Sequence, residues 1–291
     1  MNLELNSQRE TNYKKISAVM LKCIVFALLS CAVTILSHAY YSAFIEGVHG
    51  KPEFVRDNIF IYSLGERLLF AIGYIVLGNK IPIKNSFLRG FTYIMLIWSS
   101  NFMPQLMGLA GADGAIAEIA FSVSTVICDS ITYVVSGIIL GILFKNVPEA
   151  NKRSCQKASY IKTIAASAIT FPLLIIAVDQ LINKIYTPFS SVGAIGVSHE
   201  SQLTFYLYFY SWFIISGALI AVFYRLTEYN EENHLSWFRF AMKYSILIWS
   251  PVVLIMIVFG TEIIPTFFYA AVFIFCITVI SWINSKLLVC I

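Results

Sequence analysis

The sequence predicts an all-α, polytopic integral membrane protein that crosses the bilayer about eight times. Apolar residues make up 58% of the 291 residues and charged residues only 12%, and the mean hydropathy is +0.77. Soluble domains carry about twice that share of charged residues. A chain of this length cannot hide so much apolar surface in one or two soluble cores. The surplus must therefore face lipid, and we expect the protein in the cell membrane.

Eight segments are long and apolar enough to be membrane-spanning helices, which need about 20 residues to cross about 30 Å. They are residues 23–45, 58–79, 90–112, 115–144, 160–183, 201–224, 244–261 and 263–285. Isolated charges interrupt 58–79, 115–144 and 160–183, whereas the others contain no Asp, Glu, Lys or Arg. The segment 58–79 is the weakest, because it holds both Glu66 and Arg67. Without it, seven crossings would put the two termini on opposite sides.

The distribution of basic residues orients the chain with both termini in the cytoplasm. Cytoplasmic loops of membrane proteins carry an excess of Lys and Arg. With the N-terminus inside, 16 of the 20 Lys and Arg residues fall on the cytoplasmic side. Lys51, Arg56 and Lys184 fall outside, and Arg67 lies within a span. We expect the first span to be retained, because its apolar stretch exceeds the roughly 7–15 residues of a signal peptide.

The chain divides into two halves with similar sequences. Residues 28–44 and 173–189 share seven identities without gaps, and 93–99 and 244–250 share Tyr, Leu, Ile, Trp and Ser. The matches fall in the first and third spans of each half, whereas the second and fourth align poorly. A duplication of four helices keeps both copies in the same orientation, about an axis along the membrane normal. Chance similarity between apolar helices is the alternative.

This division gives four regions. They are a cytoplasmic tail (1–15), a first four-helix membrane repeat (16–145), a cytoplasmic linker (146–159) and a second four-helix repeat (160–291).

Three charged residues near the middle of spans are the first candidates for function: Glu66, Arg67 and Asp129. Ionisable groups inside a membrane cost about 2.5–3.5 kcal/mol at a helix centre and mark functional sites by default. Adjacent helical residues point about 100° apart, so we expect Arg67 to pair with Asp129 rather than with Glu66. The alternatives are a substrate-binding site and an ion pair that locks the helices together.

A second set of polar residues lies toward the outer face. It comprises Asn101, Gln105, Glu118 and Asp179. Pro104 lies between the first two and would free a backbone carbonyl, a device that lines cavities in membrane helices. We interpret the four side chains as an outward-facing polar cleft.

Other kinds of site are missing from the sequence. It contains no GxxxxGK[ST] phosphate-binding motif, and its four His form no paired metal-binding pattern. We therefore expect no metal and no cofactor. No basic run suits a nucleic acid. The six Cys fall in spans or on the cytoplasmic side, as expected for free thiols that pack as small apolar residues.

Three functions remain in order of preference. The first is transport of a small solute or lipid, as a permease-like protein or the membrane subunit of a transporter, with a polar cleft between the halves. The second is a non-catalytic accessory, immunity or scaffold protein that acts through helix contacts with a partner subunit. The third is a membrane-embedded enzyme on lipid-like substrates, which would need a convergent catalytic cluster. The sequence shows no such cluster, so an enzyme is the least favoured.

Overall fold

The computed structural model describes the backbone of residues 2–44, 53–110, 116–145, 157–185, 202–228, 235–259 and 263–287. Side chains are described over narrower ranges. These are residues 15–37, 60–99, 126–145, 159–178, 181, 211, 213–227, 235–251, 254 and 270–287.

Eight α-helices and one short 3-10 turn make up the described chain, which contains no strand. The first four are α1 (Asn2–Phe44), α2 (Glu53–Val76), α3 (Ser86–Ala110) and α4 (Ile116–Leu143), with η1 (Gly78–Lys80) between α2 and α3. The second four are α5 (Lys157–Ile185), α6 (Gln202–Glu228), α7 (Ser236–Phe259) and α8 (Ile263–Leu287). The all-α prediction is confirmed for these residues, and each helix overlaps one of the eight apolar segments.

Five helical stretches within the described side chains are long and apolar enough to cross a membrane. They are Lys15–Ser37, Phe60–Lys80, Val126–Leu143, Ser159–Val178 and Ala270–Leu287. A shorter apolar stretch, Phe213–Thr227, belongs to α6. These helices make the chain compatible with a membrane protein. The doubtful second segment, with Glu66 and Arg67, is among the five.

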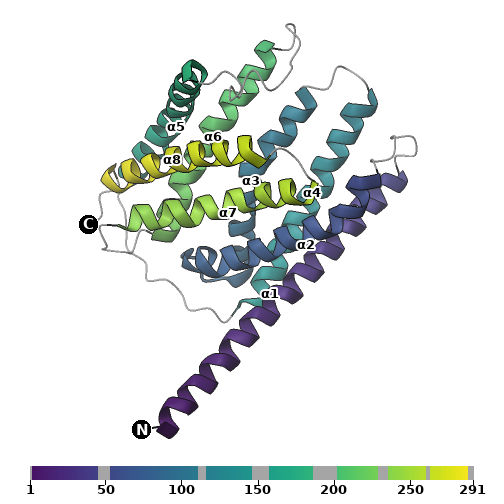
Figure 1. Ribbon diagram of the computed structural model, residues 1–291, viewed down its shortest axis with the longest axis vertical. Coiled ribbons are helices and arrows are strands. Elements are labelled where there is room, and N and C mark those ends of the chain that lie inside the picture. Colours follow the sequence, from purple (N-terminus) through teal and green to yellow (C-terminus); the bar gives the residue numbers. More distant parts are fainter. Residues whose placement is uncertain are drawn as a thin grey trace.

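Several helices begin earlier than charge counting predicts, and α1 and α7 differ most from the prediction. Helix α1 begins at Asn2 and has 43 residues, about 64 Å at 1.5 Å per residue, so residues expected as a tail continue the helix. Its N-terminal part projects beyond the other helices (Figure 1). Helix α7 begins at Ser236 and includes Arg239 and Lys243. Long cationic side chains extend to water from the ends of membrane helices, so a charge-free criterion underestimates their length.

The two halves share three helix contacts, and in the second half α6 also packs against α8. Helix α1 packs against α2 and α4, and α3 packs against α4. In the second half α5 packs against α6 and α8, and α7 packs against α8. The halves meet where α2 packs against α7 and α3 against α6. Figure 1 shows α7 and α8 side by side and α3 beside α4.

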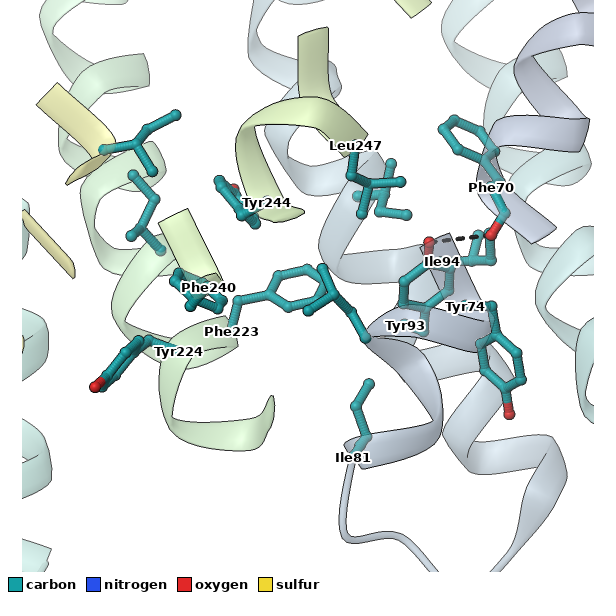
Figure 2. Packing of buried hydrophobic residues seen from close by; sticks show 14 of the residues in the cluster. Phe70, Tyr74, Ile81, Tyr93, Ile94, Phe223, Tyr224, Phe240, Tyr244 and Leu247 are labelled. Atoms are coloured by element: carbon teal, nitrogen blue, oxygen red, sulfur yellow. Dashed lines mark hydrogen bonds between the residues drawn. The ribbon is translucent and has the colours of Figure 1, made fainter. Parts of the chain in front are cut away.

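Aromatic side chains fill the junction between the halves, where α2, α3, α6 and α7 converge (Figure 2). The Tyr93 and Phe223 rings are 6.2 Å apart, and the Phe223 and Tyr244 rings 5.4 Å apart, both edge to face. Edge-to-face pairs add about 0.5–1.5 kcal/mol beyond area burial. The Tyr93 hydroxyl donates a hydrogen bond of 3.0 Å to the Phe70 carbonyl. The junction is therefore a packed aromatic core in which the buried Tyr93 hydroxyl has a hydrogen-bond partner.

Glycines allow the backbones of α3 and α4 to touch. A Cβ on Gly141 would lie 2.6 Å from the Cα of Phe87, and one on Gly137 would lie 2.8 Å from the Cα of Phe91. One on Gly90 would collide with the backbones of Gly137 and Gly141. The GxxxG spacing of Gly137 and Gly141 is typical of close helix pairs in membranes, and it fixes α4 against α3 here.

Candidate functional site

Glu66 and Arg67 lie about halfway along α2, which packs between α1 and α7. Both are buried, with relative exposures of 6% and 2%. The residue before them, Gly65, approaches Leu254 of α7 so closely that a Cβ would collide with that side chain. The two charges therefore lie inside the bundle, close to the helix contact that joins the halves.

The two neighbours form an ion pair with each other, contrary to the expectation from helix geometry. Arg67 Nη2 lies 3.3 Å from Glu66 Oε2. Their Cα–Cβ bonds diverge, but both side chains are long enough to turn back toward each other. A buried environment strengthens their attraction, since the effective dielectric constant is low. The expectation that adjacent helical residues do not pair is therefore wrong for two side chains of this length.

Two tyrosine hydroxyls complete the surroundings of Glu66. Tyr62, one turn earlier in α2, donates to Glu66 Oε1 at 3.2 Å. Tyr133 of α4 donates to the same oxygen at 3.5 Å. Hydrogen bonds to a charged group are worth about 1.5–3 kcal/mol, roughly twice the value for neutral partners. Glu66 thus has an ion pair on one carboxylate oxygen and hydroxyl contacts on the other.

The Arg67 guanidinium lies between two aromatic rings. Its central carbon is 4.9 Å from the centroid of Tyr133 and 5.3 Å from that of Phe70. Desolvated cation–π contacts are worth about 2 kcal/mol. Its Nε and Nη1 atoms are buried and have no hydrogen-bond partner among the described residues. Within the part of the bundle that the structure describes, the contacts of these two nitrogens are therefore with the flanking aromatic rings and not with hydrogen-bond acceptors.

Asp129 of α4 lies close enough to interact electrostatically with both Arg67 and Glu66. It is half-buried. The three charged residues singled out in the sequence thus come together, and the ion pair of 3.3 Å joins Glu66 and Arg67. We call Tyr62, Glu66, Arg67, Asp129 and Tyr133 the charged cluster.

A seam of small polar groups joins α4 to α1 beside the charged cluster. The Ser37 and Thr132 hydroxyls are 3.3 Å apart, and Cys128 Sγ donates to the Ser37 carbonyl at 3.4 Å. Thr34 donates back to the Ser30 carbonyl at 2.9 Å within α1. This seam places Cys128, the residue before Asp129, at the α1–α4 contact.

Sequence reasoning missed the two tyrosines of the cluster, although a signal was present. Tyr62 precedes Glu66 by four residues, and Tyr133 follows Asp129 by four. Residues at this spacing lie on the same helix face. Reading the intramembrane charges together with their i±4 neighbours would have found both.

The four residues of the predicted outer polar cleft fall in helices α3, α4 and α5. Asn101 and Gln105 belong to α3, Glu118 to α4 and Asp179 to α5. Their side chains lie outside the described residues, so the cleft stays a prediction.

Three further buried or stacked polar groups lie away from the charged cluster. Asn284 of α8 is fully buried and accepts a hydrogen bond of 2.6 Å from Ser167 of α5. Arg89 of α3 is 2% exposed. The Arg225 guanidinium of α6 lies over the ring of Tyr160 of α5, 3.8 Å from its centroid. The Asn284 contact joins α5 to α8, and the Arg225 contact joins α5 to α6. Both contacts are better explained by helix packing than by a catalytic role.

The described residues hold no group of three or more His, Cys, Asp or Glu that could bind a metal ion. Cys23, Cys31, Cys128 and Cys276 are buried, and none of the four forms a disulfide. Comparison of the chain with protein-family models, with curated protein sequences and with solved structures finds no match.

Proposed function

We propose that the chain is a membrane transport protein in which eight spanning helices move a small solute or lipid past the charged cluster. The observation that carries this proposal is the burial of Glu66 and Arg67 halfway along α2, where two Arg67 nitrogens have no hydrogen-bond partner among the described residues. Intramembrane charges of this kind mark substrate and ion pathways. A purely structural pair is expected to satisfy its donors more fully.

The proposal includes two duplicated halves, 16–145 and 160–291, related by an axis along the membrane normal. The order of helix neighbours supports it. Exchanging α1–α4 with α5–α8 turns the α1–α2, α1–α4 and α3–α4 contacts into α5–α6, α5–α8 and α7–α8. The same exchange turns the α2–α7 contact into α6–α3. Transporters with repeats of this kind place their site between the halves.

Ring contacts at the junction support the same repeat and extend it to the second helix of each half. Tyr93 and Tyr244 are aligned in sequence. The Tyr93 ring contacts Tyr74 of α2 at 5.2 Å, and the Tyr244 ring contacts Phe223 of α6 at 5.4 Å. In the proposed repeat Tyr74 corresponds to Phe223, a match that apolar sequence alone does not give.

In this register, Ile215 and Ser216 of α6 correspond to Glu66 and Arg67 of α2. The second half thus lacks the charged pair. The costly charged pair is kept in one copy of the duplication and not in the other. This difference favours a specific task for the pair in the first half. We infer that the solute passes on the α2 side of the junction.

A second candidate is the accessory or scaffold protein. It is favoured by the way Glu66 is satisfied inside the bundle, by Arg67 and two tyrosine hydroxyls. On this account the cluster locks α2 to α4 and carries no solute.

Metabolite profiling tests the transport proposal even though the solute is unidentified. Cells that express the full chain are compared with cells that express the Glu66→Leu/Arg67→Met variant, at equal membrane levels. The proposal predicts at least one solute whose distribution between cell and medium depends on the wild-type pair. Arg239→Met, which removes an exposed cation of α7, is the matched control and should leave the profile unchanged. Identical profiles for wild type and the double variant would reject transport through this site.

A further inference from the structure

We propose that the adjoining ends of α5, α6 and α8 bind the headgroup of an anionic phospholipid. Four side chains make up this basic face: Tyr160 and Lys162 near the start of α5, Arg225 near the end of α6, and Lys286 near the end of α8. The proposal does not rest on transport, because the basic face lies on helices other than α2 and α4, which carry the charged cluster.

Contacts between the three helices bring these ends together. The Arg225 guanidinium carbon is 3.8 Å from the centroid of the Tyr160 ring, across α6 and α5. The residue before Tyr160, Ser159, donates a hydrogen bond of 2.7 Å to the carbonyl of Leu287, which follows Lys286. Helix α6 also packs against α8. Cations from three helices are therefore placed at the beginning of α5.

The stacking of Arg225 on Tyr160 holds the guanidinium in place without using its hydrogen-bond donors. A separation of 3.8 Å is close to the van der Waals contact of two flat groups, so the guanidinium lies on the face of the ring. This attraction is to the π electrons, whereas the five N–H donors lie in the guanidinium plane. Such a planar fork matches the oxygens of a phosphate. Arg225 is half-buried, so its edge still reaches the surface of the bundle.

The charge of the basic face favours an anionic ligand. The described side chains at these helix ends, residues 159–163, 222–227 and 283–287, include three cations and no Asp or Glu. Two of the cations, Lys162 and Lys286, are exposed. A Lys or Arg near the surface of an anionic membrane contributes about 1 kcal/mol to binding. A negatively charged headgroup is therefore the complementary ligand.

Exposed apolar side chains beside the basic face favour a lipid over an anion in solution. Along α5, Ile161, Ile169 and Leu173 are each more than half exposed. Residues spaced by four along a helix lie on the same face, so the three form a strip that begins next to Lys162. An acyl chain can lie along this strip while its headgroup stays at the cations. The arrangement therefore fits both parts of an anionic phospholipid.

Native mass spectrometry of the full chain in mild detergent measures which lipid the protein retains. The protein is mixed with equal amounts of phosphatidylglycerol and phosphatidylcholine that carry identical acyl chains. The wild type should retain phosphatidylglycerol preferentially. Arg225→Gln should weaken this retention about fivefold, and adding Lys286→Gln about fivefold again, since about 1 kcal/mol per cation corresponds to that factor. The matched control is Lys84→Gln/Lys145→Gln, which removes two exposed cations beside α3 and α4 and should keep the preference.

A further variant separates the planar fork from charge alone. Arg225→Lys keeps the charge and loses the paired donors, so it should also weaken the retention of phosphatidylglycerol. Circular dichroism and thermal unfolding without added lipid check that each variant is folded. If the Arg225 variants do not fold, Lys162→Gln/Lys286→Gln must lower the retention by itself.

Equal retention of the two lipids by the wild type would overturn the proposal, and so would a preference that Arg225→Gln/Lys286→Gln keeps. An equal loss in the Lys84→Gln/Lys145→Gln control would show that cations outside the basic face bind lipid as well, and would overturn a defined site. Full retention by Arg225→Lys would overturn the role of the stacked guanidinium. Inorganic phosphate should displace no more lipid than sodium chloride of the same ionic strength. Greater displacement by phosphate would assign the site to an anion in solution and overturn the lipid.

Discussion

Arg67 and Glu66, adjacent in the sequence, form an ion pair of 3.3 Å inside the bundle. Removing one partner of a buried pair costs about 3–5 kcal/mol, because the other charge is left buried, whereas replacing both by apolar residues is often neutral. We therefore expect Arg67→Met to lower the stability of the purified protein far more than Glu66→Leu/Arg67→Met. Thermal unfolding in mild detergent measures both. Equal losses for the single and double variants would contradict a coupled pair.

The two roles of Tyr133 can be separated by substitution. Tyr133→Phe removes the hydroxyl that contacts Glu66 and keeps the ring against Arg67. We expect it to cost about 1–2 kcal/mol, as for a hydrogen bond to a charged group. Tyr133→Leu also removes the cation–π contact and should cost about 2 kcal/mol more. Thermal unfolding of the two variants measures the difference. Equal stabilities for Tyr133→Phe and Tyr133→Leu would mean that the aromatic ring contributes nothing to the stability.

The glycine contact between α3 and α4 makes a strong prediction about folding. Gly141→Leu would drive a side chain into the backbone of Phe87, and overpacking of this kind costs about 1–3 kcal/mol or more. We expect a lower yield of folded protein and a lower unfolding temperature, measured by size-exclusion chromatography and heating.

The neighbouring Ile142 is the control for this glycine. It is 50% exposed on the same helix, so Ile142→Leu should leave both measurements unchanged. If Gly141→Leu also left the yield of folded protein and the unfolding temperature unchanged, α3 and α4 would not be in backbone contact.

The proposed eight crossings place both ends of the chain on the same side of the membrane, in the cytoplasm. Reporter domains that fold only in the cytoplasm, fused to the N-terminus or to the C-terminus, should both be active. The physical reason is the excess of Lys and Arg in the segments proposed to be cytoplasmic. An active N-terminal and an inactive C-terminal fusion would mean an odd number of crossings, and the α2 segment would be the first to re-examine.

The sequence predicts the helices well because apolar length alone determines where a chain can lie in lipid. It predicts their ends less well. Arg239 and Lys243 belong to α7, although a charge-free criterion places both outside the span.

The sequence predicts which charged residues form the site, but it does not predict which residues they contact. Glu66, Arg67 and Asp129 were evident, since charges are rare in apolar helices. Their partners depend on side-chain reach and on which helices meet. The contact between Tyr133 and Glu66, 67 residues apart in the chain, follows only from the packing of α1, α2 and α4.

Transport past the charged cluster requires an aqueous path that reaches it. Ser63 is buried one turn before Arg67 on the same face of α2, and Ala71 lies one turn after it. In a background with the six Cys replaced, Ser63→Cys and Ala71→Cys are treated with a small membrane-impermeant methanethiosulfonate. A transport pathway predicts rapid modification of Cys at 63 from one aqueous side and none at 71, in the aromatic core. Complete protection at both positions would contradict transport, because a sealed cluster can carry no solute.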